Sequence, residues 1–242
     1  MEKWVKDPTI FKVIMLGEYH SGKTSVLNQY YDDTYTKRFK DTCKNQKGVR
    51  EKRYCYDPQL QKFVLNTNKD PFWDDCKGQE EIHLHYKVQI WDTSGHEKNR
   101  NLFRSYYHDN DGVILVYDIT NRSTFVKLSK WIKEIDNNME GCQVVLVGNK
   151  LDRIKQTFSS KTKHEPAIRQ VSFDEGLKLA HKNGFSFFEA SAKTHINLSE
   201  AFSTLVSSMI TTQNRLPPPL PSVHLHKSSP NTSTSPPWWK SL

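Results

Sequence analysis

The strongest structural signal in the sequence is the stretch Gly17-Glu18-Tyr19-His20-Ser21-Gly22-Lys23-Thr24. It fits G-x-x-x-x-G-K-[ST], a loop whose backbone N–H groups surround nucleotide phosphates while the lysine neutralises them and the last hydroxyl reaches Mg²⁺. Residues 11–16 before it form an apolar run that predicts a buried strand. Residues 23–31 after it predict a helix whose N-terminal dipole points at the phosphates. The stretch therefore predicts a phosphate-binding loop between a strand and a helix.

The rest of the chain alternates strands with helices. Residues 49–56 predict a strand, and apolar residues alternate with polar ones over residues 82–90, which predicts a half-exposed strand antiparallel to it. Buried strands are predicted at 113–117, 144–147 and 185–188, and helices at 124–137, 172–182 and 197–212. We expect an α/β fold: a mostly parallel six-stranded sheet with one antiparallel strand and helices on both faces.

A second motif, Trp91-Asp92-Thr93-Ser94-Gly95-His96, follows the strand at 82–90. Asp92 lies at the end of this strand and faces the phosphate loop, where its carboxylate can hold Mg²⁺ through water. Gly95 has no side chain, so its N–H can approach the terminal phosphate closely. This motif predicts a metal and phosphate contact at the edge where parallel strands end.

Two further motifs predict a base-binding site. In Asn149-Lys150-Leu151-Asp152, the aspartate can accept the ring N–H and the exocyclic amine of guanine, and adenine offers no such donor pair. The wrong base would leave a partly buried charge unpaired, which costs on the order of 10³-fold in affinity. In Glu189-Ala190-Ser191-Ala192-Lys193, the Ala192 N–H can reach the guanine carbonyl oxygen. The motifs favour guanine over the alternative of an ATP-dependent phosphotransferase.

In this order the motifs resemble those of Ras-superfamily small GTPases. The WDTSG run at 91–95, Ser105-Tyr106-Tyr107 and Val116-Tyr117-Asp118-Ile119-Thr120 make the chain most similar to the Rab branch, over about residues 10–213. The resemblance implies a P-loop NTPase small G domain. It also implies a molecular switch that binds GTP or GDP with Mg²⁺, hydrolyses GTP, and acts in intracellular membrane trafficking or signalling.

The resemblance implies roles for individual residues. Lys23 would bind the β- and γ-phosphates, and Tyr35 would pack edge-on against the base. Thr24, Thr42 and Asp92 would hold Mg²⁺, and His96, Lys23 and Gly95 would be catalytic. The nucleotide-binding set as a whole would be Gly17, Glu18, Tyr19, His20, Ser21, Gly22, Lys23, Thr24, Ser25, Tyr35, Thr42, Asp92, Gly95, Asn149, Lys150, Asp152, Ser191, Ala192 and Lys193.

Several positions depart from the family pattern. Five residues, 43–47, separate Thr42 from Gly48, where Rab proteins place the glycine almost at once. His96 stands where a glutamine normally orients the attacking water, so we expect slow intrinsic hydrolysis. Tyr19 and His20 replace small residues and could crowd the terminal phosphate, or point to solvent and change nothing. The alternative function is a hydrolysis-deficient GTP-binding scaffold.

Length and composition predict one domain with additions. The domain organisation that we expect is an N-terminal extension at 1–9, a small G domain at 10–213 with insertions at about 43–47, 57–81 and 154–169, and a disordered Pro/Ser-rich tail at 214–242. The formal charge of +8 lies mainly in residues 37–53, 153–169 and the tail. Since this excess positive charge lies outside the nucleotide-binding motifs, we expect these stretches to be solvated loops, and we expect no nucleic-acid partner.

The implied partners are proteins: effectors, an exchange factor and a GTPase-activating protein. Residues 216–221 predict a polyproline segment, a candidate ligand for a proline-recognising module, although a plain disordered tail is the simpler interpretation. The longest apolar run, 112–117, is too short to cross a membrane, and the last cysteine is Cys142, so we expect no prenyl anchor. We expect a cytoplasmic protein with at most peripheral contact to endomembranes, through partners.

Overall fold

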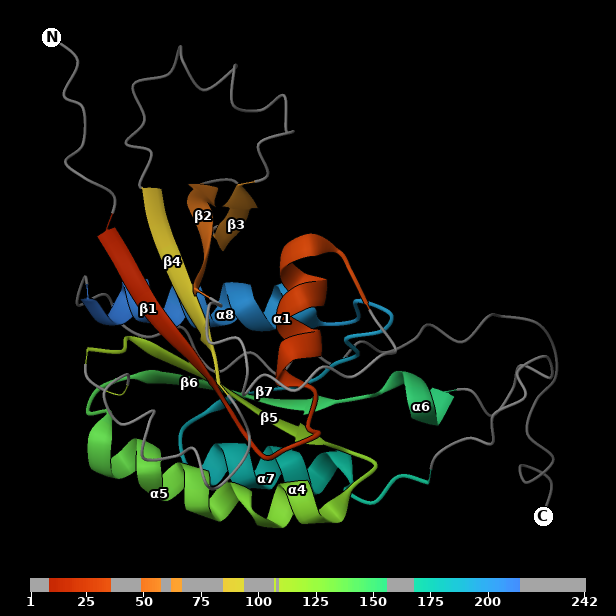
Figure 1. Cartoon of the computed structure of the whole chain (residues 1–242). Helices are drawn as coiled ribbons and strands as arrows, with labels where there is room; N and C mark the ends of the chain where they lie inside the picture. Colours follow the sequence, from red (N-terminus) through yellow and green to blue (C-terminus); the bar gives the residue numbers. More distant parts are fainter. Residues whose placement is uncertain are drawn as a thin grey trace, which may run out of the picture.

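The computed structural model describes residues 9–35, 49–57, 62–66, 85–93, 107, 109–155 and 168–213. Within these ranges a seven-stranded sheet lies between two layers of helices (Figure 1). The α/β class with helices on both faces is therefore confirmed. The predictions for Thr42, Gly95, His96 and the segment 216–221 fall outside the described residues.

The sheet has strands from the whole length of the domain. In spatial order they are β3 (Lys62–Asn66), β2 (Val49–Asp57), β4 (His85–Asp92), β1 (Thr9–Leu16), β5 (Gly112–Asp118), β6 (Gln143–Asn149) and β7 (Ser186–Glu189). β1 pairs in parallel with β4 and β5, and β6 pairs in parallel with β5 and β7. The carboxyl ends of these strands therefore lie along one edge, where such sheets bind ligands.

One strand runs against the others, as predicted. β2 is antiparallel to β4, with Val49 opposite Trp91, and antiparallel to β3 on its other side. The prediction of six strands was wrong, because β3 lies in the segment 57–81 that we expected to be an inserted loop. The run Phe63-Val64-Leu65 is too short to stand out among polar neighbours, yet it supplies the β-forming residues that extend the sheet.

The helices divide into two layers. α1 (Lys23–Asp32) and α8 (Leu198–Gln213) cover one face, and α4 (Arg122–Val126), α5 (Leu128–Asn138) and α7 (Phe173–Lys182) cover the other (Figure 1). The short α6 (Asp152–Lys155) follows β6. None of the helices in the described ranges is long and apolar enough to cross a membrane.

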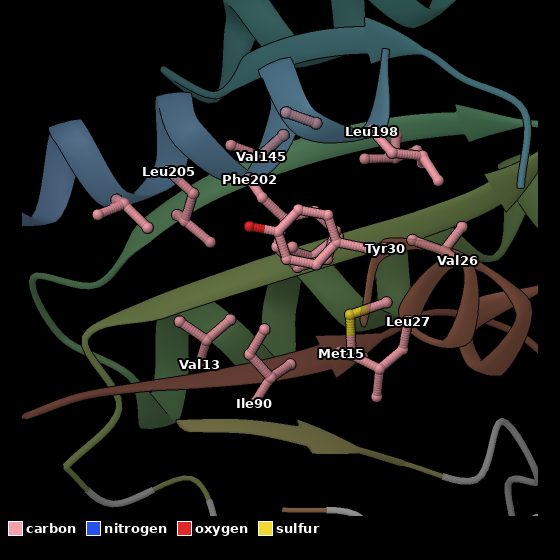
Figure 2. Packing of buried hydrophobic residues seen from close by; sticks show 14 of the residues in the cluster. Val13, Met15, Val26, Leu27, Tyr30, Ile90, Val145, Leu198, Phe202 and Leu205 are labelled. Atoms are coloured by element: carbon pink, nitrogen blue, oxygen red, sulfur yellow. The ribbon is translucent and has the colours of Figure 1, made fainter. Parts of the chain in front are cut away.

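Burial on both faces of β1 explains its continuous apolar run. Val13 and Met15 point into the cluster under α1 and α8, whereas Ile14 and Leu16 point into the cluster under α5 and α7. In the first cluster the ring of Tyr30 from α1 stacks on that of Phe202 from α8, with ring centroids 3.7 Å apart and an interplanar angle of 1° (Figure 2). This contact fixes α1, and with it the loop that precedes α1, to α8.

The single helix predicted at 124–137 is in fact two. Asn121 caps α4 through its side chain, and α4 ends at Val126 because Lys127 caps both α4 and α5. Thr124 is buried within α4, where its hydroxyl accepts a hydrogen bond from the Asp118 N–H at 3.0 Å. This local bond ties the short helix to the end of β5. The helix predicted at 172–182 is confirmed as α7, whose first turn is fixed by a capping box between Ser172 and Glu175.

Candidate functional site

The loop between β1 and α1 requires glycine at both ends. Gly17 has a φ of +137°, and a Cβ there would lie 2.1 Å from the carbonyl oxygen of Val116 on β5. Gly22 has a φ of +95°, and a Cβ there would lie 2.4 Å from the side-chain nitrogen of Asn149. Any larger residue would clash at either position, so the sequence motif reflects the space available between β1, β5 and β6.

Lys23 places a buried ammonium group inside this loop. Its Nζ donates hydrogen bonds to the carbonyl oxygens of Gly17, at 2.9 Å, and Glu18, at 3.1 Å. Burial lowers the pKa of Lys23 to about 8, although the carboxylates of Asp92 and Glu18 act to raise it. A buried cation at a helix N-terminus, held only by neutral carbonyls among its described hydrogen-bond partners, fits an anion such as a phosphate.

Thr24 and Asp92 bring two oxygen groups together beside the loop. The Thr24 hydroxyl donates a hydrogen bond to the Asp92 carboxylate at 2.7 Å. Asp92 lies at the end of β4, where it pairs with Met15 near the end of β1. Mg²⁺ prefers oxygen ligands and is commonly bound by one or two side chains together with phosphates and water. The chemistry of this pair therefore fits Mg²⁺, with Thr24 able to ligate it directly and Asp92 through water.

Asn149, at the end of β6, joins three of the predicted motifs. Its side-chain amide donates to the Ser21 carbonyl at 3.0 Å, and its side-chain oxygen accepts from the backbone N–H groups of Ala192, at 3.2 Å, and Lys150, at 2.8 Å. Asn149 is almost completely buried, so these bonds are shielded from water. One side chain thus holds the phosphate loop, the loop after β6 and the loop after β7 in fixed relative positions.

Lys150 adds a second link between the loop after β6 and the phosphate loop. Its Nζ donates to the His20 carbonyl at 2.8 Å and forms an ion pair with the Asp118 carboxylate at 2.7 Å. His20 has a φ of +62°, a left-handed conformation that usually needs glycine. The bond from Lys150 helps to offset the cost of that conformation.

Asp152 lies beside the loop that follows β7. Its Oδ1 accepts a hydrogen bond from the Ser191 hydroxyl at 2.7 Å, and its Oδ2 lies 3.8 Å from the Lys193 ammonium. Partial burial raises the pKa of Tyr35, the negative charge of Asp152 acts in the same direction, and Arg153 acts to lower it. Tyr35 as a residue is 41% exposed, so it can contact a ligand.

Comparison with known proteins identifies the family. A protein-family sequence model described as the Ras family matches residues 56–211, which is more than half of the chain. The chain belongs to the Ras family. The zebrafish (Danio rerio) "Ras-related protein Rab-18-B" is 34% identical over 206 residues, which is 84% of this chain and 81% of that protein.

Other relatives place this Ras-family protein in the Rab branch. The human (Homo sapiens) "Ras-related protein Rab-3A" is 34% identical over 198 residues, 81% of this chain and 72% of that protein. The rat (Rattus norvegicus) "GTP-binding protein Rab-3D" is 31% identical over 229 residues, 94% of this chain and 87% of that protein. The resemblance inferred from the sequence motifs is therefore confirmed.

The bulky residues of the phosphate loop contact each other in this Ras-family protein. The rings of Tyr19 and His20 meet edge-on, with centroids 3.9 Å apart and an interplanar angle of 74°. Tyr19 is half-buried and His20 is exposed. Ser25, another predicted site residue, is half-buried in the first turn of α1. The pair therefore lies at the rim of the loop.

Three acidic residues support the site through ion pairs, and of these only Glu18 was predicted as part of it. Asp118 binds Lys150, Glu18 forms an ion pair with Lys127 at 2.9 Å, and Glu189 forms a two-bond ion pair with Arg169. A carboxylate at the end of the fully buried strand β5 was a usable signal for Asp118. Arg169 was assigned to a solvated basic insertion, 154–169, but it fastens the end of β7, with its second nitrogen 2.9 Å from Glu189.

Ser21 carries a hydroxyl that is buried without compensation. Its Oγ is fully shielded from solvent and has no hydrogen-bond partner among the described residues. Ser191 is equally buried, but its hydroxyl donates to Asp152 and accepts from the N–H groups of Lys193 and Thr194. The two serines thus form a matched pair, one with an unsatisfied hydroxyl and one with three hydrogen bonds.

We expect Ser21→Ala to stabilise the protein and Ser191→Ala to destabilise it. Removing an unsatisfied buried hydroxyl recovers its desolvation cost, so Ser21→Ala should raise the free energy of unfolding by about 1 kcal/mol. Ser191→Ala should lower it by about 1–3 kcal/mol, because it leaves Asp152 and two backbone N–H groups with one bond fewer. Urea denaturation of both variants in the same buffer measures this, and a loss of stability in Ser21→Ala equal to that in Ser191→Ala would contradict it.

Proposed function

We propose that this Rab-branch protein is a GTP-binding molecular switch that binds GTP or GDP with Mg²⁺. The observation that supports the proposal most directly is the position of Asn149, whose amide links the phosphate loop to both loops of the predicted base site. A nucleotide whose phosphates lie against residues 17–24 would place its base beside Asp152. The relative position of the phosphate loop and the predicted base site is thus set by one buried, hydrogen-bonded side chain.

At the phosphate end, Lys23 would exchange its two carbonyl partners for phosphate oxygens. The ammonium is already buried and desolvated, so its attraction to β- and γ-phosphate oxygens is only weakly screened. Thr24 and Asp92 would hold the metal, and Mg²⁺ when bound supplies positive charge to the phosphate oxygens. The remaining contacts would come from backbone N–H groups of residues 17–25.

At the base end, Asp152 would accept the two N–H donors that guanine presents on one edge. Ser191 already donates to one Asp152 oxygen, and Lys193 lies near the other, so the carboxylate is oriented before a ligand arrives. The Ala192 N–H and the ring of Tyr35 would complete the base site. Adenine would leave the charge of Asp152 without donors.

Hydrolysis is the step for which we propose a departure from the family. Gly95, His96 and Thr42, all outside the described residues, would contact the terminal phosphate, the attacking water and Mg²⁺. Histidine would orient that water less well than glutamine, so hydrolysis would be slow, and a hydrolysis-deficient scaffold is the second candidate. As in the family, the partners would be effectors, an exchange factor and a GTPase-activating protein. The protein would lie in the cytoplasm or peripherally at endomembranes. Residues 216–221 would be a candidate ligand for a proline-recognising module.

We expect Asp152→Ala to abolish the preference for guanine. Wild-type protein with Mg²⁺ should bind GDP at least about 10³-fold more tightly than ADP, and the variant should lose most of that ratio. Competition of GDP and ADP against a fluorescent guanine nucleotide measures both affinities. Asp136→Ala removes an exposed carboxylate on α5 and serves as the control. An unchanged ratio in Asp152→Ala, or effective displacement by ADP from the wild type, would reject the proposed base site.

Nucleotide binding should take up a proton at alkaline pH. The pKa of Lys23 is about 8 in the free protein, and phosphate charges favour the ammonium form, so binding must raise this pKa. The affinity should be full below pH 7 and fall as the pH rises above 8. At pH 8.5 binding should take up about 0.8 proton, measured by calorimetry in two buffers of different ionisation enthalpy. Lys133→Met, on the exposed face of α5, should keep the uptake, and proton release on binding would contradict the role of Lys23.

We expect His96→Gln to accelerate hydrolysis. In single-turnover experiments with preloaded GTP, the variant should hydrolyse at least about tenfold faster than the wild type, since glutamine positions the attacking water. His181→Gln, on the exposed surface of α7, is the control and should leave the rate unchanged. A rate in His96→Gln equal to or below that of the wild type would contradict this role for His96. No turnover in either protein would favour the scaffold.

A further inference from the structure

The phosphate loop contains a buried negative charge, that of Glu18. The carboxylate is 6% exposed, and its backbone carbonyl accepts hydrogen bonds from the Lys23 ammonium, at 3.1 Å, and from the Ser21 N–H, at 3.2 Å. The same residue therefore holds the cation of the loop through its main chain and places an anion beside it through its side chain. A carboxylate in a site for anions needs a counter-charge, since an unpaired charge there would repel the ligand.

Lys127 supplies that counter-charge from a different part of the chain. Its Nζ lies 2.9 Å from the Glu18 carboxylate, and its side chain is 41% exposed. The charge of this carboxylate also acts on the Lys23 ammonium, so Lys127 and Lys23 carry positive charge near it. The two residues are 109 positions apart, so neither the phosphate-loop motif nor its neighbours in sequence predict the pair.

The backbone around Lys127 fixes where its side chain can reach. α4 ends and α5 begins at this residue, and its own N–H bonds to the carbonyls of Ser123 and Phe125. α4 is anchored in turn by Thr124, whose hydroxyl is bonded to the backbone of Asp118, and by Phe125, whose ring lies 5.1 Å from that of Tyr117. The break between the helices is thus held by buried contacts, and it presents Lys127 to the phosphate loop.

We propose that Lys127 is a positioning and charge-neutralising residue for the nucleotide site, which acts through Glu18 to let the phosphate loop accept the extra negative charge of a triphosphate. This inference rests on the proposed binding of guanine nucleotides. Without Lys127, the carboxylate of Glu18 would stay buried beside the phosphates and would oppose GTP more than GDP. Lys127 itself need not touch the nucleotide, because its effect is carried by the charge of Glu18 and by the position of the Glu18 carbonyl, which bonds Lys23.

The test compares the affinities of a non-hydrolysable GTP analogue and of GDP, with Mg²⁺ at low ionic strength, in the full-length protein. Lys127→Met should weaken binding of the analogue about tenfold and of GDP about threefold or less. Glu18→Gln, which keeps Lys127 and removes the negative charge, should shift the preference toward the analogue by about threefold. The double variant Glu18→Gln with Lys127→Met should return the ratio of the two affinities to within about twofold of the wild type.

Two controls separate charge from structure. Lys127→Arg keeps the charge and should keep the wild-type ratio, and Lys133→Met removes an exposed lysine from α5 and should do the same. A ratio in Lys127→Met equal to that of the wild type, or a double variant that keeps the defect of Lys127→Met, would overturn the inference. If Lys127→Met does not fold, an unchanged ratio in Glu18→Gln overturns it equally. A wild type that binds neither nucleotide instead overturns the proposed function on which the inference rests.

Discussion

The buried ammonium of Lys23 is the constraint on which the rest of the site depends. Water is excluded from it, its depressed pKa reflects that cost, and two backbone carbonyls compensate the charge only in part. A ligand of opposite charge would compensate the rest of this buried charge. The phosphate loop, the glycines that let it pass β5 and Asn149, and the start of α1 all serve to hold this cation at the edge of the sheet.

The sheet explains why distant motifs meet at this edge. β1, β4, β5, β6 and β7 are parallel, so the loops that follow them project to one side, and Asn149 then fixes three of these loops by hydrogen bonds. The packing behind them is equally specific. The stacked rings of Tyr30 and Phe202 tie α1 to α8, so the final helix of the domain supports the first loop of the site.

Local sequence was sufficient for the elements that have a local cause. The apolar runs of β1, β5 and β6 and the helical spacing of residues 172–182 can be read from a few neighbouring residues, and each was predicted. Features with a long-range cause were missed. β3 is short and gains its stability from pairing with β2, and the ion pair of Lys127 with Glu18 joins residues 109 positions apart. Arg169 looked like one more basic loop residue, because its partner Glu189 lies 20 positions away.

The central claim is that Lys23 and Asp152 hold the two ends of one guanine nucleotide. The most direct test is to denature the purified full-length protein, prepared with Mg²⁺, and to quantify the released nucleotides by anion-exchange chromatography. The account predicts about one guanine nucleotide per protein chain and no adenine nucleotide, because tight binding survives purification. A folded protein that releases no guanine nucleotide, even after incubation with micromolar GTP, or that releases adenine nucleotides instead, would contradict it.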